Sequence, residues 1–294
     1  MIFSSIFKLE RKSIILVAEM RKFFILGITL ITCLAAHAQN FLSWQLNDRY
    51  FSVQAGAGFA SYRGELKHNG SIQNEVSNLN LAIEARLWSK VSARLLVGNY
   101  AIRGHDKHAP DSSWARQRNL SFYSRNLEAA LQGVFYLRSY RGDYYKRWKL
   151  DPYVALGVGF TTVNPMADLG NESYALYDIA TEDASYSRLT VILPAAAGLK
   201  WKVNPYLNFI TEVAFRYTFS DYLDDVSGQY PTSYPNTTAE LLSNRKDEIG
   251  VVNEEAYESL TSGMPRGDHS DKDAYLFLNL KLEYYLPPGL FSKN

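Results

Sequence analysis

Two groups of residues in this chain have types that could do chemistry, and the first contains a pair of histidines. His105 and His108 flank Asp106, and Asp111 and the pair Ser112–Ser113 follow closely. Hydrolysis by a serine needs a nucleophile, a base and a group that orients the base. The spacing matches no nucleophile motif, and polar loops commonly contain these residue types. Hydrolysis of lipids or peptides is therefore the least favoured function for this chain.

The second group is acidic. Asp221, Asp224 and Asp225 offer the oxygen ligands that Ca²⁺ prefers, but calcium loops space their ligands at alternate positions and contain a turn glycine. These three aspartates have neither feature. We expect no metal site and no cofactor.

A larger set of charged side chains occupies alternate positions in otherwise apolar segments. Because successive residues of a strand point to opposite faces, such charges share one face. In a closed barrel that face lines the lumen, where charges have to pair with one another. The predicted luminal charge network consists of Glu84, Arg86, Arg94, Glu128, Glu212, Arg216, Lys281 and Glu283.

Eight strand-length segments carry this alternation. Each spans roughly 9–14 residues, which is enough to cross a bilayer at a tilt, and no run of 18 apolar residues follows the leader. The segments are Tyr50–Tyr62, Leu79–Leu87, Ser92–Ile102, Leu127–Phe135, Pro152–Phe160, Leu189–Val203, Leu207–Phe219 and Leu276–Tyr284.

The connections between these segments are alternately long (63–77, 103–118, 161–188 and 220–272) and short (89–91, 138–151 and 204–205). An even strand count with this asymmetry is typical of outer-membrane barrels. We predict an all-β fold, an eight-stranded antiparallel transmembrane β-barrel over residues 50–286, with a side-chain-filled lumen, long extracellular loops and short periplasmic turns. The alternative, a β-sandwich exported to the periplasm, would have shorter strands and more even loops.

The beginning of the chain reads as an export signal. Arg21–Lys22, the apolar run from Phe23 to Ala36 and the sequence Ala36-His37-Ala38 fit a signal peptide cleaved after Ala38, with translation starting at Met1 or at Met20. The apolar run is too short to span a bilayer. The predicted divisions are residues 1–38 (extension and signal peptide), 39–49 (periplasmic segment), 50–286 (barrel) and 287–294 (periplasmic tail).

Cleavage would remove the single cysteine, five basic and two acidic residues, leaving 26 basic and 28 acidic residues. The mature chain would then have no disulfide framework and no thiolate metal site. Its near-neutral charge argues against nucleic acid as a partner.

The turn over residues 138–151 is longer than a barrel turn requires. It holds five basic and two acidic residues together with Tyr144, Tyr145 and Trp148. Interfaces are enriched in Trp, Tyr and Arg, so we predict Arg141, Arg147 and Trp148 as contacts to a periplasmic partner. Anchoring of the aromatic rings in the headgroup layer explains the same pattern equally well.

Four segments together resemble one known family. They are residues 118–122 (Arg-Asn-Leu-Ser-Phe), residues 151–165 with their glycine-rich strand, the run Asp221-Tyr222-Leu223-Asp224-Asp225-Val226-Ser227-Gly228, and residues 263–267 (Gly-Met-Pro-Arg-Gly). They are similar to the PorG-like small outer-membrane β-barrels of Bacteroidetes, which include a component of the type IX secretion system. The resemblance covers essentially the whole mature chain.

This resemblance implies a non-enzymatic barrel in the cell outer membrane of a Gram-negative, Bacteroidetes-type bacterium. Its surroundings would be the lipid bilayer and lipopolysaccharide, and its partners a periplasmic ring of lipoprotein and soluble subunits. An OmpA- or OmpX-like barrel with a general envelope role is the alternative, followed by a hydrolytic barrel.

Overall fold

The computed structural model describes residues 51–67, 77–139 and 143–286. The predicted signal peptide, the segments 39–49 and 287–294, and the candidate contact Arg141 lie outside the described residues. Among the described residues, no helix is long and apolar enough to cross a membrane.

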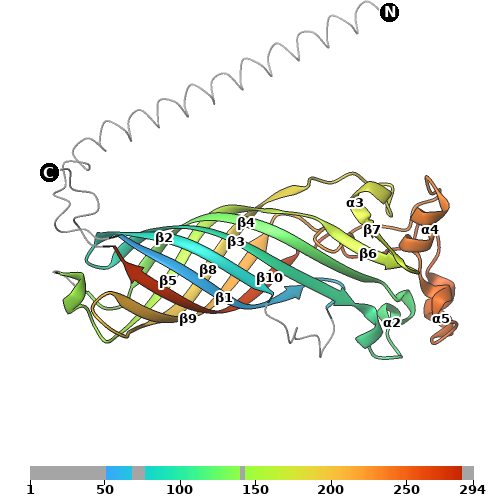
Figure 1. The fold of residues 1–294 in the computed structure, drawn as a ribbon. Helices are drawn as coiled ribbons and strands as arrows, with labels where there is room; N and C mark the ends of the chain where they lie inside the picture. The colour runs from blue at the N-terminus through green and yellow to red at the C-terminus, as the bar shows by residue number, and fades with distance from the viewer. Residues whose placement is uncertain (1–50, 68–76, 140–142, 287–294) are drawn as a thin grey trace, which may run out of the picture. The chain divides into compact units, whose positions relative to one another are not determined.

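Eight antiparallel strands close into a barrel (Figure 1). Each strand pairs with its neighbour in the sequence, and the last strand pairs with the first to close the ring. The prediction of an eight-stranded barrel is confirmed. The strands are β1 (Phe51–Arg63), β2 (Asn78–Trp88), β3 (Val91–His105), β4 (Ser121–Tyr136), β5 (Leu150–Thr162), β8 (Leu189–Lys202), β9 (Leu207–Thr218) and β10 (Ala274–Tyr285).

The outer face of the barrel is apolar. Leucine, isoleucine, valine and phenylalanine side chains from the ring strands are exposed there, while the alternate residues are buried in the lumen. At the end with the short turns, this apolar belt is bordered by exposed aromatic rings of Trp88, Trp148, Trp201, Tyr206 and Tyr284. An apolar band with an aromatic girdle is the surface that a lipid bilayer covers.

The opposite end of the barrel extends further than the alternation predicts. The strand β4 begins at Ser121, six residues before the predicted start at Leu127, and pairs with β3 as far as His105. The predicted loop 161–188 contains a further hairpin, β6 (Pro165–Leu169) and β7 (Glu172–Ala175), whose first strand pairs with β4. These parts of the sheet lie beyond the apolar belt.

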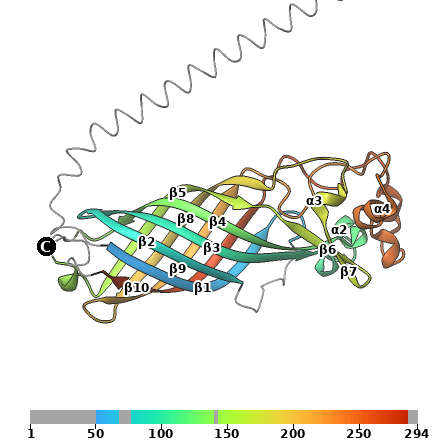
Figure 2. The same ribbon diagram turned by 45° about the horizontal axis from the view of Figure 1, so that its top comes forward.

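The long loops fold into a cap over this end (Figure 2). Short α-helices α2 (Trp114–Arg118), α3 (Leu176–Ile179), α4 (Thr237–Ser243) and α5 (Glu254–Ser259) belong to it, with 3₁₀ turns η2 (Asp106–His108) and η4 (Lys246–Glu248); a third turn, η3 (Tyr144–Lys146), lies at the short-turn end. Asn253 caps α5 by accepting a hydrogen bond from the backbone N–H of Ala256.

One proline departs from expectation. Because proline lacks the N–H that a ladder needs, Pro194 is expected at a bend or rim. It instead lies within β8, at the register position opposite Gly157 of β5. The β5–β8 ladder is interrupted there, between the pairs Leu156–Ala195 and Gly159–Ile192. This local interruption is what accommodates the proline.

Candidate functional site

The lumen is filled by a continuous chain of ion pairs. Lys200 Nζ lies 2.7 Å from Glu283 Oε1 and 3.0 Å from Glu84 Oε1. Arg94 continues the chain, with Nη2 3.1 Å from Glu84 Oε2 and Nη1 2.8 Å from Glu212 Oε2. Three acids thus alternate with cations along the lumen. The chain ends at Lys281, whose Nζ lies 2.6 Å from Glu212 Oε1.

Neutral side chains complete the coordination of these carboxylates. Tyr153 donates to Glu212 at 2.6 Å, and Tyr136 donates to Glu84. Gln54 donates to Glu84 and to Glu283, at 2.9 and 3.1 Å. A buried charge is tolerated best when it is paired and hydrogen-bonded. Every ion of this chain is paired, and its three carboxylates also accept hydrogen bonds from neutral side chains.

Two more luminal cations lie outside the chain. Arg216 binds Glu128 through both carboxylate oxygens, at 2.9 and 3.2 Å. Arg86 stacks on the ring of Tyr136 at 3.9 Å and donates to the backbone carbonyl of Ser89. The structure therefore places all eight predicted network residues in buried positions.

Lys200 is as central as any of these eight residues, but it was not predicted. Its strand offers little contrast between faces, because Ala195, Ala196 and Ala197 occupy both of them. Every second residue counted from the buried Ile192, through Ala196, lies on the same face of the strand. Extending this count to residue 200 would have predicted Lys200 as luminal.

The cap is organised around two buried arginines. Arg118 donates to both carboxylate oxygens of Asp106, at 2.7 and 2.9 Å, and to the backbone carbonyl of Arg266. Arg266 in turn donates to Glu182 at 2.8 Å and to the carbonyl of Asp225 at 2.5 Å. These bonds tie together three of the four long loops.

The family-like run 221–228 lies within this cap and is used to hold it together. Leu223 and Val226 pack into the core, and Ser227 donates to Asp221 at 2.6 Å. Asp225 has a φ of 68° and accepts hydrogen bonds from Thr181 and Tyr186. The remaining members also serve the cap, because Tyr222 stacks on Tyr186 and the backbone N–H of Gly228 donates to Glu182.

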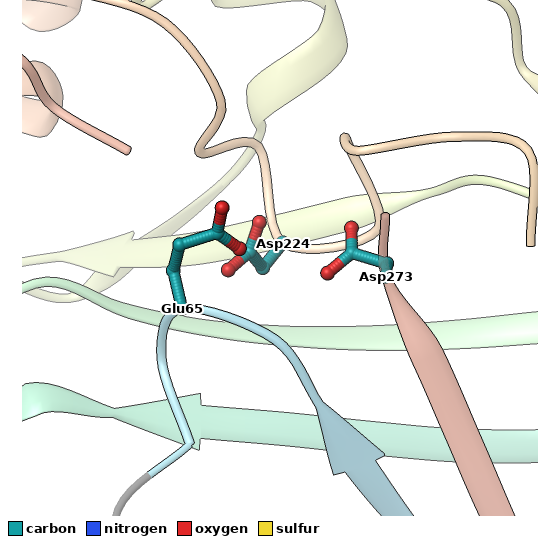
Figure 3. Close-up of side chains that lie close together, drawn as sticks. All are labelled: Glu65, Asp224 and Asp273. Carbon is teal, nitrogen blue, oxygen red and sulfur yellow. The ribbon is translucent and has the colours of Figure 1, made fainter. Parts of the chain in front are cut away.

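Three carboxyl groups meet where β1, the run 221–228 and β10 join (Figure 3). Glu65, Asp224 and Asp273 each place an oxygen within 4.8 Å of the others. The hydroxyl of Tyr62 lies 2.7 Å from Asp224 and 2.5 Å from Asp273. Glu65 and Asp273 were not predicted as part of a site, because they are far from Asp224 in the chain.

The hydrogen-bond pattern requires this acidic cluster to hold protons. A tyrosine hydroxyl has one hydrogen and so donates to only one of the two aspartates. The contact with the second aspartate is a hydrogen bond when the carboxyl group of that aspartate is protonated and donates to the phenolic oxygen of Tyr62. Burial raises the pKa of Asp224 and of Asp273 well above the usual range and that of Glu65 to about 7, and the neighbouring carboxylates add to each effect.

Carboxylate oxygens are also the ligands of Ca²⁺, which takes six to eight of them. Of the described residues, Glu65, Asp224 and Asp273 form the set able to reach one ion together. Asp221 does not join them, because it accepts a hydrogen bond from Ser227. Asp225 does not join them either, because it is bound by Thr181, Tyr186 and Arg266. The three aspartates grouped in the sequence are thus separated in the structure.

The histidine group does not assemble a hydrolytic site. The rings of His105 and His108 lie 6.3 Å apart, centre to centre. Asp106 is bound by Arg118 and by the backbone N–H of Leu120, so its oxygens are already used. Ser113 caps α2 by accepting from the backbone N–H of Arg116.

At the short-turn end, one predicted contact has to be corrected. Arg147 is only 8% exposed and binds Asn208, at 2.6 and 3.0 Å, and the backbone carbonyls of the turn 204–207. Its guanidinium is buried at the barrel end and is not part of the exposed surface of the turn. Trp148, 47% exposed, remains on the surface and donates to the carbonyl of Ser139.

No protein-family model and no curated protein matches the chain. Similar solved structures include Neisserial surface protein A, with 11% identity, coverage of 80% of this chain and 96% of that chain, and a TM-score of 0.38. The N-terminal β-barrel domain of OprF from Pseudomonas aeruginosa has 11% identity, coverage of 80% and 97%, and a TM-score of 0.37. A major outer membrane protein from Thermus thermophilus has 14% identity, coverage of 81% and 99%, and a TM-score of 0.38.

Proposed function

We propose that this chain is a non-enzymatic outer-membrane barrel that acts through its surfaces. The observation that carries this proposal is the lumen, in which the ion-pair chain from Glu283 to Lys281 occupies the space that a solute would need. A closed antiparallel barrel with an apolar belt is suited to the outer membrane of a Gram-negative bacterium. In that setting the cap faces outward and the short turns lie in the periplasm.

The finer proposal is a role in type IX protein secretion, as a barrel that docks to a periplasmic ring of partner subunits. It is supported by the resemblance that includes the run 221–228. The short-turn end supplies suitable docking chemistry, because Trp148, Tyr145, Lys146 and Lys149 are exposed there.

A second candidate is a general envelope role of the kind that OmpA- or OmpX-like barrels have. The sealed lumen and the closely bonded cap favour it, because a barrel that only strengthens the envelope needs no partner. The two candidates differ in what the cell loses when the gene is removed.

Deletion of the gene tests the choice. Loss of export of C-terminally tagged substrates, with the barrel co-purifying with periplasmic subunits, supports the secretion role. Normal export combined with sensitivity to detergents supports the envelope role. Hydrolysis of lipids or peptides by the purified protein, abolished by replacing His105 and His108 together, would overturn both.

The docking surface is tested by a pair of matched variants. Trp148→Ala with Lys149→Ala removes an exposed aromatic ring and a cation from the 138–151 turn, whereas Trp88→Ala with Lys90→Ala removes the same types from a neighbouring short turn. If the turn docks a partner, only the first pair reduces co-purification. Equal reduction by both pairs means that the aromatic rings act as membrane anchors.

A further inference from the structure

The end of the cap that lies furthest from the barrel exposes neighbouring apolar side chains. This end contains η4, α5 and the link 249–253 between them (Figure 1). In the link, Val251 is 61% and Val252 is 39% exposed, and Ile249 is partly exposed. Single apolar residues are common on protein surfaces, whereas a group of them bordered by polar residues marks an interaction site.

The backbone of the link is held in place by Gln117 of α2, whose side chain is fully buried. Gln117 donates to the carbonyl oxygen of Gly250 at 2.8 Å, and it accepts from the backbone N–H groups of Val252 and Asn253 at 2.8 and 2.9 Å. Gly250 has a φ of 69°, in the left-handed region that favours glycine. The valines therefore cannot turn inward without breaking these bonds, and their exposure is part of the fold.

The helix α5, which follows the link, has an acidic face. Glu254, Glu255 and Glu258 are all exposed, and their spacing places them on one side of the helix. The helix dipole favours the two acids in the first turn, but it disfavours Glu258 in the last turn. Like charges four residues apart, such as Glu254 and Glu258, also destabilise a helix. Helix stability therefore does not explain this set of acids.

The two cations next to this face are already bound. Arg245 pairs with Glu248 at 2.9 Å, and Lys246 donates to two backbone carbonyls at the end of α5, both at 3.0 Å. In the part of the chain that the structure describes, the three glutamates of α5 form no ion pair. Residues 245–259 contain five acidic and two basic residues, and the segment 68–76, outside the described residues, contains no lysine or arginine.

We propose that the link and α5 together bind a basic, partly apolar peptide segment of a protein outside the cell. Its apolar side chains would cover Val251 and Val252, and its lysines or arginines would pair with the glutamates of α5. Complementary charge orients such a partner, and the burial of apolar surface holds it. The inference goes beyond the periplasmic docking proposed above and uses that proposal only to place the cap outside the cell.

Peptide binding to the purified full-length protein tests the proposal. The protein is placed in phosphatidylcholine nanodiscs and titrated against a fluorescent peptide of alternating lysine and leucine, with empty nanodiscs as the blank. We expect saturable binding by the wild type. The variant Val251→Thr, Val252→Thr keeps the shape of the side chains and should bind about tenfold more weakly.

The acidic face is tested by the variant Glu254→Gln, Glu258→Gln. We expect about tenfold weaker binding and a smaller dependence on salt. This variant removes a repelling pair, so loss of the helix would not account for the result. Asp268→Asn with Asp271→Asn removes two exposed acids from another part of the cap and should bind as the wild type does.

Three results would overturn the proposal. The first is wild-type binding no stronger than that of empty nanodiscs. The second is an equal loss of binding in the two acid variants, which would show general attraction to the cap. The third is equally tight binding of a peptide of alternating lysine and serine, which would show that the valines take no part.

Discussion

At the scale of single residues, Glu212 is the acid that joins Arg94 to Lys281 at one end of the luminal chain. It binds Arg94, Lys281 and Tyr153, and Lys281 has its ion pair only with Glu212 among the described residues. Removing one partner of a buried pair leaves an uncompensated charge. The energetic weight of the luminal network can therefore be measured at this position.

Glu212→Gln keeps the size of the side chain and removes its charge. We expect the free energy of unfolding to fall by about 3–5 kcal/mol, because Arg94 and Lys281 lose a shared counter-ion. Urea titration of the barrel folded into lipid vesicles measures this. Glu258→Gln, on the exposed face of α5, is the matched control and should change the value by less than about 0.5 kcal/mol. Equal effects at the two positions would contradict the luminal assignment.

Lys200 allows the contribution of the luminal network to stability to be tested by removing a cation. Lys200→Met retains the length and removes the charge that lies between Glu84 and Glu283. The two carboxylates then face each other without a cation between them, and we expect a loss of about 3–5 kcal/mol. The double variant Lys200→Met, Glu283→Gln should recover part of the stability, because Glu283 is the carboxylate that loses its ion pair, whereas Glu84 keeps its ion pair with Arg94. A double variant no more stable than Lys200→Met would argue against direct coupling.

At the scale of elements, two arginines of α2 provide an internal comparison. Arg118 is buried and ties Asp106 to the loop that contains Arg266. Arg116 forms an ion pair with the exposed Asp111, and such surface pairs contribute little. Arg118→Ala should expose residues 220–272 to limited proteolysis while the barrel strands stay protected, and Arg116→Ala should not. Unchanged protection in Arg118→Ala would show that the cap does not depend on this hub.

The acidic cluster gives the cap a dependence on pH. The pKa of Glu65 is raised from 4.5 to about 7 in the folded chain. A group whose pKa is higher in the folded chain than in the unfolded chain stabilises the fold at pH values below its unfolded pKa. This stabilisation is lost as the pH rises through the pKa of the folded chain. Hydrogen exchange in the run 221–228, corrected for the intrinsic effect of pH, should therefore be slower at about pH 6 than at about pH 8. Asp221→Asn removes the carboxylate that repels the ionised form of Glu65 and should flatten this profile; an identical profile would contradict the assignment.

Sequence patterns predicted the strands well where the barrel faces lipid, because apolar and polar residues alternate there. Every ring strand was found, because an apolar outer face and a polar inner face leave a two-residue period. Beyond the belt this constraint disappears, and Ser121–Asn126 and the β6–β7 hairpin carry no such signal although they are paired. These parts were predicted as loops or left unassigned.

The candidate sites show a similar limit. Glu65 and Asp273 join Asp224 through strand pairing at the barrel rim, which no local spacing encodes. Arg147 was predicted as a partner contact because the turn 138–151 is long and basic and interfaces are enriched in arginine, yet it fills the barrel end by binding Asn208. Both results depend on tertiary contacts between segments distant in sequence.

At the scale of the whole molecule, the filled lumen predicts an absence of conductance. The purified protein in planar bilayers should show no solute-dependent channel steps, because an ion would have to break pairs of 2.6–3.1 Å to pass. The variant Glu84→Ala, Arg94→Ala removes two adjacent members of the chain and should admit small ions. Steady conductance in the wild type would contradict the filled lumen.

The same luminal network has a consequence for how many copies a cell can carry. Each open pore added to an outer membrane makes the membrane more permeable to toxic compounds. The number of channel proteins that a cell can carry is therefore limited by the need to keep this permeability low. A barrel whose lumen is filled by side chains does not increase this permeability, so the limit does not apply to it. Its expression level can follow the number of partners it must bind, and raising it should leave the uptake of small antibiotics unchanged.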